Sequence, residues 1–241
     1  MKNIFSFSGG KDSTAMLIRA LEIGFPIDEI VFIDVRFSDT LGGELPEMYE
    51  YIDKIEKIEK YINRPIKRIR SEYVFNEYFF NTYKRGKREG TIYGFPHTLG
   101  GWCNSRLKEK PIIEYKKNIK ENYTMFIGIA ADEPKRLARM TENERSLLAE
   151  WGWTEQDCLD YLESKGLANP LYKKFKRTGC WFCPKQRLDS LRIIRKDYPE
   201  LWAELLRLDK YSPVSFKPKY TVQQLDEKFE REEQKNVNEV V

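Results

Sequence analysis

The residues best suited to chemistry lie near the N-terminus, in the run Ser8-Gly9-Gly10-Lys11-Asp12-Ser13. An apolar strand is expected just before it, over residues 3–8, and apolar residues at helical spacing predict a helix over about 13–23. Glycine lets the backbone approach a ligand and turn its N–H groups toward an anion, and a helix N-terminus adds positive potential. With the charge of Lys11, the run predicts a phosphate-binding loop. The alternative is a glycine turn in which Asp12 or Ser13 caps the helix.

The second set of reactive side chains consists of the four cysteines. Cys180 and Cys183 form a Cys-x-x-Cys pair, and Cys103 lies far upstream. Three thiolates suit a [4Fe–4S] cluster with one open position, or Zn²⁺ with a fourth ligand, whereas the pair alone could form a redox disulfide. Cys158 and His97 are the weaker candidates for the fourth ligand. Buried, inert thiols are the remaining interpretation. For Cys158 we prefer it because Thr154-Glu155-Gln156-Asp157 resembles a capping box, which places Cys158 in the first turn of an expected helix.

Alternating strands and helices must position these residues. Strands are expected over 3–8, 29–35, 65–70 and 124–130, and a second helix is expected over about 46–62. This alternation predicts an α/β fold with a parallel sheet and helices on both faces. Ligands in such sheets bind beyond the carboxyl ends of the strands, which is where Asp34 and Asp132 also lie.

The length of 241 residues is enough for an α/β domain with a substantial core. Because the pattern turns helical from about residue 141, we expect an α/β domain over 1–140 and a helical C-terminal region over 141–241 that carries the Cys-x-x-Cys pair and packs on the first domain. Helices are expected at about 186–196, 199–209 and 222–235. Residues 73–83 hold six aromatic side chains, which either stack on bases or pack a helix into the core.

The net charge of +4 does not by itself indicate a nucleic-acid-binding protein. From 173 to 196, however, nine basic residues stand against one acid, Asp189. This segment is either a solvated helix face or a surface for nucleic acid or an anionic nucleotide. No apolar run reaches membrane-spanning length, and Met1 leads directly into a strand, so we expect no signal peptide and no membrane partner. Together with the few cysteines, this favours the reducing cytoplasm.

Taken together, the motifs resemble the phosphoadenosine phosphosulfate (PAPS) reductase-like branch of the PP-loop, or adenine nucleotide alpha hydrolase-like, proteins. The matching pieces cover about residues 3–190 and occur in the family's order: Ser8–Ser13; Asp39-Thr40 with Gly43–Tyr49; Cys103 with Lys108 and Pro111; Gly128-Ile129 with Asp132-Glu133 and Arg136; and Gly179-Cys180 with Cys183-Pro184. The short form is similar to members found in phages and mobile bacterial DNA.

The resemblance implies a Rossmann-like fold that binds ATP or a related adenine nucleotide with Mg²⁺. It places nucleotide contacts at Ser8–Ser13, Asp34 or Asp39, and Asp132, and catalytic roles at Lys11, Asp12 and Arg136. The chain also departs from the sulfonucleotide reductases it resembles. No cysteine follows Cys183, Trp102 replaces one cysteine, and Ala130 replaces an arginine.

Three functions follow from these motifs and departures. The first is ATP cleavage at the α-phosphate, which gives AMP and pyrophosphate and activates an acceptor, with cluster-assisted sulfur transfer to nucleic acid. The second is reduction of a sulfonucleotide by an external thiol. The third is a non-catalytic nucleotide- or partner-binding module with structural zinc. The sequence leaves the oligomeric state open.

Overall fold

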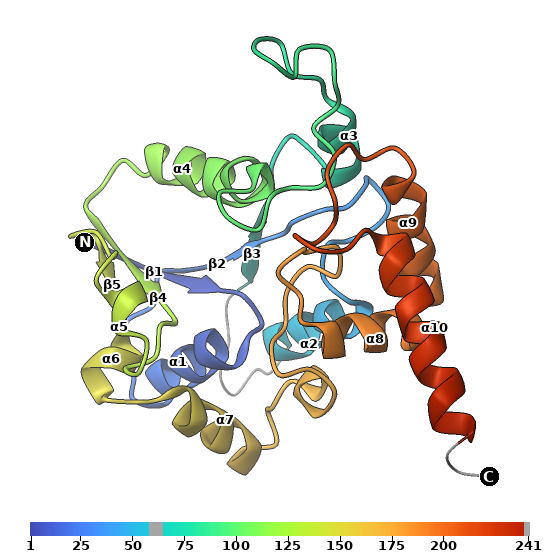
Figure 1. Ribbon diagram of the computed structural model, residues 1–241. Coiled ribbons are helices and arrows are strands. Elements are labelled where there is room, and N and C mark those ends of the chain that lie inside the picture. The colour runs from blue at the N-terminus through green and yellow to red at the C-terminus, as the bar shows by residue number, and fades with distance from the viewer. Residues whose placement is uncertain (58–64, 239–241) are drawn as a thin grey trace. The chain divides into compact units, whose positions relative to one another are not determined.

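A five-stranded parallel sheet is the centre of the fold (Figure 1). The computed structural model describes residues 1–57 and 65–238. Within them the strand order is β3-β2-β1-β4-β5. The strands are β1 (Lys2–Phe7), β2 (Glu29–Ile33), β3 (Ile66–Ile69), β4 (Tyr123–Ile127) and β5 (Glu144–Arg145). Every pairing in the sheet is parallel, so all carboxyl ends point to one edge. The predicted fold class is confirmed.

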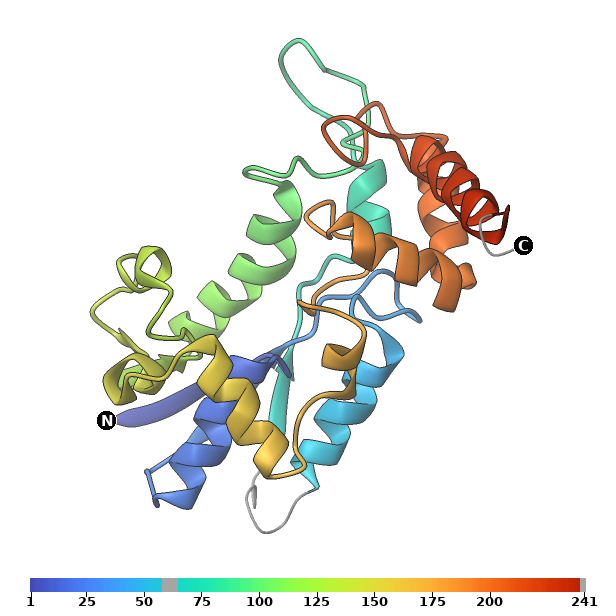
Figure 2. The same ribbon diagram turned by 60° about the horizontal axis from the view of Figure 1, so that its bottom comes forward.

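Helices cover both faces of this sheet (Figures 1 and 2). On one face lie α1 (Lys11–Glu22), α2 (Pro46–Glu56) and α7 (Glu155–Ser164), and on the other lies α4 (Lys110–Lys117). On the α4 side, Ile112 and Tyr115 pack against the buried strand residues Ile4, Val31 and Met125. The part of the expected helix 46–62 that falls on 58–64 lies outside the described residues.

The chain divides into two compact units. The first, called the sheet unit, comprises Met1–Asp34, Glu44–Arg70 and Lys110–Thr178. The second, called the helical unit, comprises Val35–Gly43, Ser71–Glu109 and Gly179–Val241. The units therefore do not follow a division at residue 140. The reason is that α6 (Leu147–Trp151) and α7 contact α1, so the chain from 141 to 178 remains with the sheet. The sheet unit also contains α5 (Pro134–Leu137) and a 3₁₀ helix, Pro170–Lys173.

An aromatic core organises the helical unit. Its helices are α3 (Phe75–Phe80), a π-helix over Asn104–Glu109, α8 (Leu188–Asp197), α9 (Pro199–Asp209) and α10 (Val222–Asn238). Phe75 and Phe79 are fully buried, and the Phe75 ring centroid lies 4.1 Å from that of Phe182. The core interpretation of the aromatic run thus holds for these two residues. None of the helices in the described residues is both long and apolar enough to span a membrane.

Candidate functional site

The glycine-rich loop joins β1 to α1 and is shaped by its own hydroxyl groups. The Ser8 N–H donates to Ser13 Oγ at 3.1 Å, and the Ser13 hydroxyl lies 3.1 Å from the Gly10 carbonyl oxygen to which it donates. Gly9 has φ of +71°, a left-handed conformation that favours glycine. Gly10 is the N-cap of α1 and makes no side-chain cap, so the alternative of a cap by Asp12 or Ser13 is wrong. The N-terminus of α1 therefore faces the loop without a cap from the loop's own carboxylate.

Gly128, just after β4, allows the loop to reach the sheet. A Cβ atom at this position would lie 2.6 Å from both the N and Cα atoms of Ser13. The start of α1 therefore packs directly on the backbone that leaves β4. This contact brings the loop next to the segment that carries Asp132 and Arg136.

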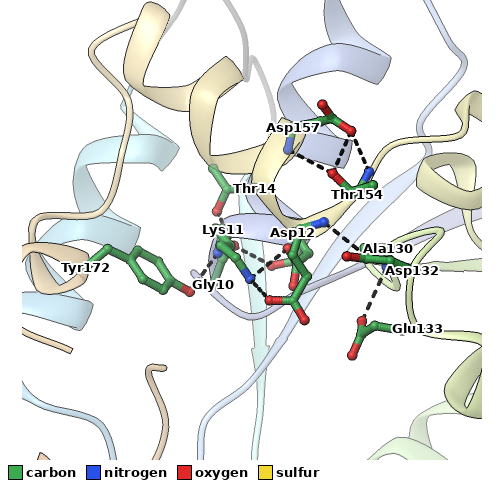
Figure 3. Close-up of polar contacts among 12 residues, drawn as sticks. Gly10, Lys11, Asp12, Thr14, Ala130, Asp132, Glu133, Thr154, Asp157 and Tyr172 are labelled. Atoms are coloured by element: carbon green, nitrogen blue, oxygen red, sulfur yellow. Dashed lines mark hydrogen bonds and ion pairs between the residues drawn. The ribbon is translucent and has the colours of Figure 1, made fainter. Parts of the chain in front are cut away.

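Lys11 is held by two carboxylates (Figure 3). Its Nζ lies 3.2 Å from Asp12 Oδ1 and forms an ion pair with Glu155, the first residue of α7. Burial by itself would lower the pKa of Lys11, but the hydrogen bond to Glu155 and the charge of Asp12 outweigh it and raise this pKa. The backbone N–H of Lys11 donates to the Tyr172 hydroxyl at 2.9 Å. Lys11 is therefore a charged side chain whose ammonium group is already paired with two carboxylates.

Asp12 lies in a more buried position. Burial raises the pKa of its carboxyl group, Lys11 opposes this, and the nearby charges of Glu155 and Glu133 raise it further. Asp12 Oδ1 is buried and has no hydrogen-bond partner apart from its ion pair with Lys11. A carboxylate oxygen in this state suits a cation or a donor that arrives with a ligand.

The segment after β4 carries two further predicted residues of the site, Asp132 and Arg136. Asp132 Oδ1 accepts the backbone N–H of Glu155 at 3.2 Å, which ties the start of α7 to this segment (Figure 3). Glu133 holds Arg136, whose Nη1 lies 2.8 and 2.7 Å from the two carboxylate oxygens. The same carboxylate accepts the Ala130 N–H at 3.3 Å. Asp132 thus positions a helix, while Arg136 is a cation paired with an acid.

A cavity of about 520 Å³ within the sheet unit brings the loop together with Glu133 and Arg136, whereas Asp132 does not line it. Among the predicted residues, its walls include Ser8, Gly10, Lys11, Asp12, Ser13 and Arg136. The sequence analysis did not select Glu133, Glu155, Tyr172 and Thr178 as site residues, and it named Lys176 and Arg177 only as part of the basic segment 173–196. The predicted cap at Thr154 could have marked Glu155 as the start of a helix, but not as a partner of Lys11.

The two candidate aspartates of the second strand end belong to different units. Asp34 follows β2 in the sheet unit and accepts a hydrogen bond from the Tyr49 hydroxyl at 3.0 Å. Burial, followed by the charge of Asp34, raises the pKa of Tyr49, so the phenol remains a donor. Asp39 is exposed in the helical unit, and its backbone oxygen accepts from Arg36 Nη2 at 2.9 Å. Asp34 is therefore the one at the carboxyl edge of the sheet.

Cys158 differs from the other cysteines in its surroundings. It is fully buried in α7 of the sheet unit. Burial, with a further contribution from Asp12, raises the pKa of its thiol to about 12. The capping box predicted at Thr154 is present, with Asp157 completing it. A neutral thiol at this place fits the core interpretation.

The remaining three cysteines belong to the helical unit. Cys180 and Cys183 lie on one turn, where the Cys183 N–H donates to the Cys180 carbonyl at 3.1 Å. Burial and the nearby Cys183 raise the pKa of Cys103, while Lys108 and Lys185 act against this increase. Cys103 and Cys183 therefore lie within electrostatic range of each other.

Only part of a metal ligand set is present at these thiols. Within residues 1–57 and 65–238, no three Cys, His, Asp or Glu side chains converge closely enough to hold a metal ion. Cys103 and Cys183, which lie within electrostatic range of each other, would supply two of the ligands of such a centre. His97 Nε2 lies 3.5 Å from the Arg88 guanidinium, a cationic neighbour that disfavours metal binding.

Acidic residues of α10 neutralise part of the basic segment 173–196. In the helical unit, Arg192 pairs with Glu232 at 2.8 Å, and Arg195 pairs with Asp226 at 2.7 Å. In the sheet unit, Lys176 and Arg177 form no ion pair with any described residue, and both line the cavity of the loop. The two halves of this segment thus differ in the charge they present.

A parallel α/β sheet with a glycine-rich loop and a basic cavity at its carboxyl edge defines a nucleotide-binding protein of the PP-loop kind. The phosphoadenosine phosphosulfate reductase domain family matches residues 2–186, so the chain belongs to this family. The family indicates an enzyme that binds adenine nucleotides. The resemblance inferred from the motifs is confirmed.

Three relatives are themselves uncharacterized. One protein of Methanocaldococcus jannaschii is 32% identical over 82% of this chain and 39% of its own length. Another protein of that organism is 28% identical over 84% of this chain and 47% of its own length. An uncharacterized nin region protein of Escherichia phage lambda is 26% identical over 82% of this chain and 70% of its own length. The chain thus spans less than half the length of the two archaeal relatives it matches.

Proposed function

We propose that this protein binds ATP at the loop Ser8–Ser13 and cleaves it between the α- and β-phosphates, which transfers AMP to an acceptor. The observation that carries this proposal is the cavity of about 520 Å³, in which the N-terminus of α1, Lys11, Arg136, Lys176 and Arg177 face one space. Backbone N–H groups and cations in a concave site are the features that a polyphosphate requires.

In this reaction a nucleophilic atom of the acceptor attacks the α-phosphorus and the bond to the bridging oxygen of the β-phosphate breaks. Pyrophosphate leaves with the electron pair of that bond, and the acceptor proton passes to solvent. Lys11 and Arg136 stabilise the negative charge that develops on the leaving group. Asp132 fixes the start of α7 and so the wall of the cavity.

Asp12 would hold a Mg²⁺ ion that arrives with the nucleotide. Mg²⁺ is usually bound through one or two carboxylates together with substrate phosphates. The buried Asp12 Oδ1, without a hydrogen-bond partner, fits this role. The ion supplies charge neutralisation on the phosphates.

Pyrophosphate release tests this proposal. The protein is mixed with ATP, Mg²⁺ and cellular nucleic acid, and pyrophosphate is measured against a variant that lacks Lys11. Release that depends on Lys11 supports the proposal. Tight ATP or AMP binding without release would indicate a binding module instead.

The family match favours a second candidate, reduction of a sulfonucleotide. An external thiolate would attack the sulfur of the sulfonucleotide and displace the nucleotide phosphate. A second thiol would then release sulfite and form a disulfide. No cysteine follows Cys183 in the sequence, and in this candidate an external molecule would supply both thiols. Sulfite release from adenylyl sulfate in the presence of thioredoxin would favour this candidate over ATP cleavage.

For sulfur transfer to the activated acceptor, the proposal adds a metal ion or cluster bound by Cys103, Cys180 and Cys183. The Cys-x-x-Cys pair, and the position of Cys103 within electrostatic range of Cys183, support this part of the proposal. Because burial raises the pKa of Cys103, a bound metal would have to displace the proton of this thiol. After purification without oxygen, we expect about four irons and four sulfides per chain, or about one zinc. Cys183→Ser should lose the metal and Cys158→Ala should keep it. A wild-type protein without iron or zinc would contradict this part of the proposal.

Nucleic acid is the proposed acceptor, and its contact with the sheet unit would depend on Lys176 and Arg177. Each phosphate contact adds about 0.7–0.9 to the slope of log affinity against log salt. We therefore expect a variant with both Lys176→Ala and Arg177→Ala to lower the magnitude of this slope by about 1.4–1.8. Arg187→Ala is the matched control because Arg187 is already paired with Asp189 at 3.2 Å. Equal slopes for all three proteins would contradict the assignment.

A further inference from the structure

We propose that Glu155 competes with the nucleotide phosphates for Lys11, so that binding exchanges an internal carboxylate for an external polyphosphate. This inference rests on the proposed function, since it concerns the same cavity. It assigns Glu155 as a specificity-determining residue that selects for ligands able to reach Lys11.

The carboxylate of Glu155 is held in place before any ligand arrives. Glu155 is the first residue of α7, and the capping box of Thr154 and Asp157 fixes this end of the helix. Its backbone N–H donates to Asp132 Oδ1 at 3.2 Å. Two independent sets of contacts thus fix the backbone from which the Glu155 side chain reaches Lys11.

The charges of the cavity show which cations a ligand meets first. Lys11 is paired with Asp12 and Glu155, and Arg136 is paired with Glu133. Lys176 and Arg177 have no ion pair with the described residues. A polyphosphate can therefore pair with Lys176 and Arg177 without breaking an ion pair inside the protein. It can pair with Lys11 only by displacing Glu155.

Exposure makes this exchange feasible. The Glu155 side chain keeps 47% of its accessible surface, whereas Lys11 keeps 13%. The carboxylate can turn into solvent while Lys11 stays in the cavity. Because partly exposed ion pairs contribute little net stability, the pair is weak enough for phosphate to replace it and strong enough to reduce affinity.

Equilibrium binding to Glu155→Gln tests the competition. Binding of ATP, inorganic pyrophosphate and adenosine is measured without Mg²⁺ and again with it. Without Mg²⁺ we expect Glu155→Gln to bind ATP and pyrophosphate about two- to fivefold more tightly than the wild type. Adenosine, which has no phosphate to reach Lys11, should bind equally to both. Glu163→Gln, an exposed substitution on the same helix, is the matched control and should change nothing.

The outcomes separate this inference from the proposed function. If the wild type does not bind ATP but Glu155→Gln binds pyrophosphate more tightly, the competition stands and the nucleotide function fails. Unchanged or weaker pyrophosphate binding by Glu155→Gln without Mg²⁺ overturns the competition. The competition is also overturned if Glu155→Gln binds ATP more weakly than the wild type with Mg²⁺ and no more tightly without Mg²⁺. That result would instead assign Glu155 as a ligand of the cation. Tighter binding of adenosine as well as ATP by Glu155→Gln would show a change in cavity shape and would also overturn the competition.

Discussion

Replacing Lys11 by methionine should lower the rate of pyrophosphate formation from ATP by about 10²–10³-fold. This is the usual cost of removing one preorganised group that stabilises the charge developing in the transition state. Lys11 is the cation that the loop itself supplies, and its charged form is maintained by Glu155 and Asp12. Methionine keeps much of the length and none of the charge. The measurement is single-turnover pyrophosphate release at saturating ATP and Mg²⁺.

Two further variants make this result specific. Lys54→Met removes the same charge from an exposed position on α2 of the sheet unit and should leave the rate unchanged. Lys11→Arg keeps a positive charge beside Asp12 and Glu155 and should recover part of the rate. A Lys11→Met protein that folds, binds ATP and releases pyrophosphate at the wild-type rate would remove Lys11 from the mechanism.

The local parts of the site could be predicted from the sequence. The loop is defined by residues adjacent in the chain, a strand, two glycines and a helix start, so its position follows from short-range patterns. The predicted helix over 13–23 corresponds to α1 over Lys11–Glu22, and the predicted helix over 199–209 is α9. The parallel sheet follows from the alternation of strands and helices.

The contacts that close the site are long-range and leave no such pattern. Glu155 lies 144 positions from Lys11, and Tyr172 lies 161 positions from it. The two residues of β5 are too few to show periodicity. The acidic partners of the α8 arginines lie on α10, some 30–40 positions later in the chain. In the sequence, therefore, the segment around these arginines shows an excess of positive charge. Propensity and spacing cannot reveal which distant side chains meet.

The units also explain why a single boundary could not be predicted. The sheet unit is built from three separate stretches of chain, and the helical unit from three others. A change of composition along the chain can mark a boundary only between domains that are each continuous in sequence. Here residues 71–109 belong to the helical unit, although the residues just before and after them, including β4, belong to the sheet unit.

Gly128→Ala should weaken ATP binding by more than tenfold and lower the unfolding midpoint by about 2–12 °C, as overpacking costs about 1–3 kcal/mol. The added Cβ would lie 2.6 Å from the N and Cα atoms of Ser13 and 2.9 Å from the carbonyl carbon of Asp12. These are backbone atoms, which cannot rotate away as a flexible side chain can. The start of α1 must shift, and the loop N–H groups move with it.

Gly24→Ala separates loss of the loop from loss of stability. Gly24 follows the other end of α1, has φ of +68°, and has open space where a Cβ would lie. Alanine there should also lower the unfolding midpoint, because a non-glycine residue at positive φ is strained, yet ATP affinity should stay within twofold. Calorimetric binding and thermal unfolding of both variants provide the measurement. If the two substitutions reduced ATP affinity equally, the close contact of Gly128 with Ser13 would have no special part in forming the site, because strain at either end of α1 would have the same effect.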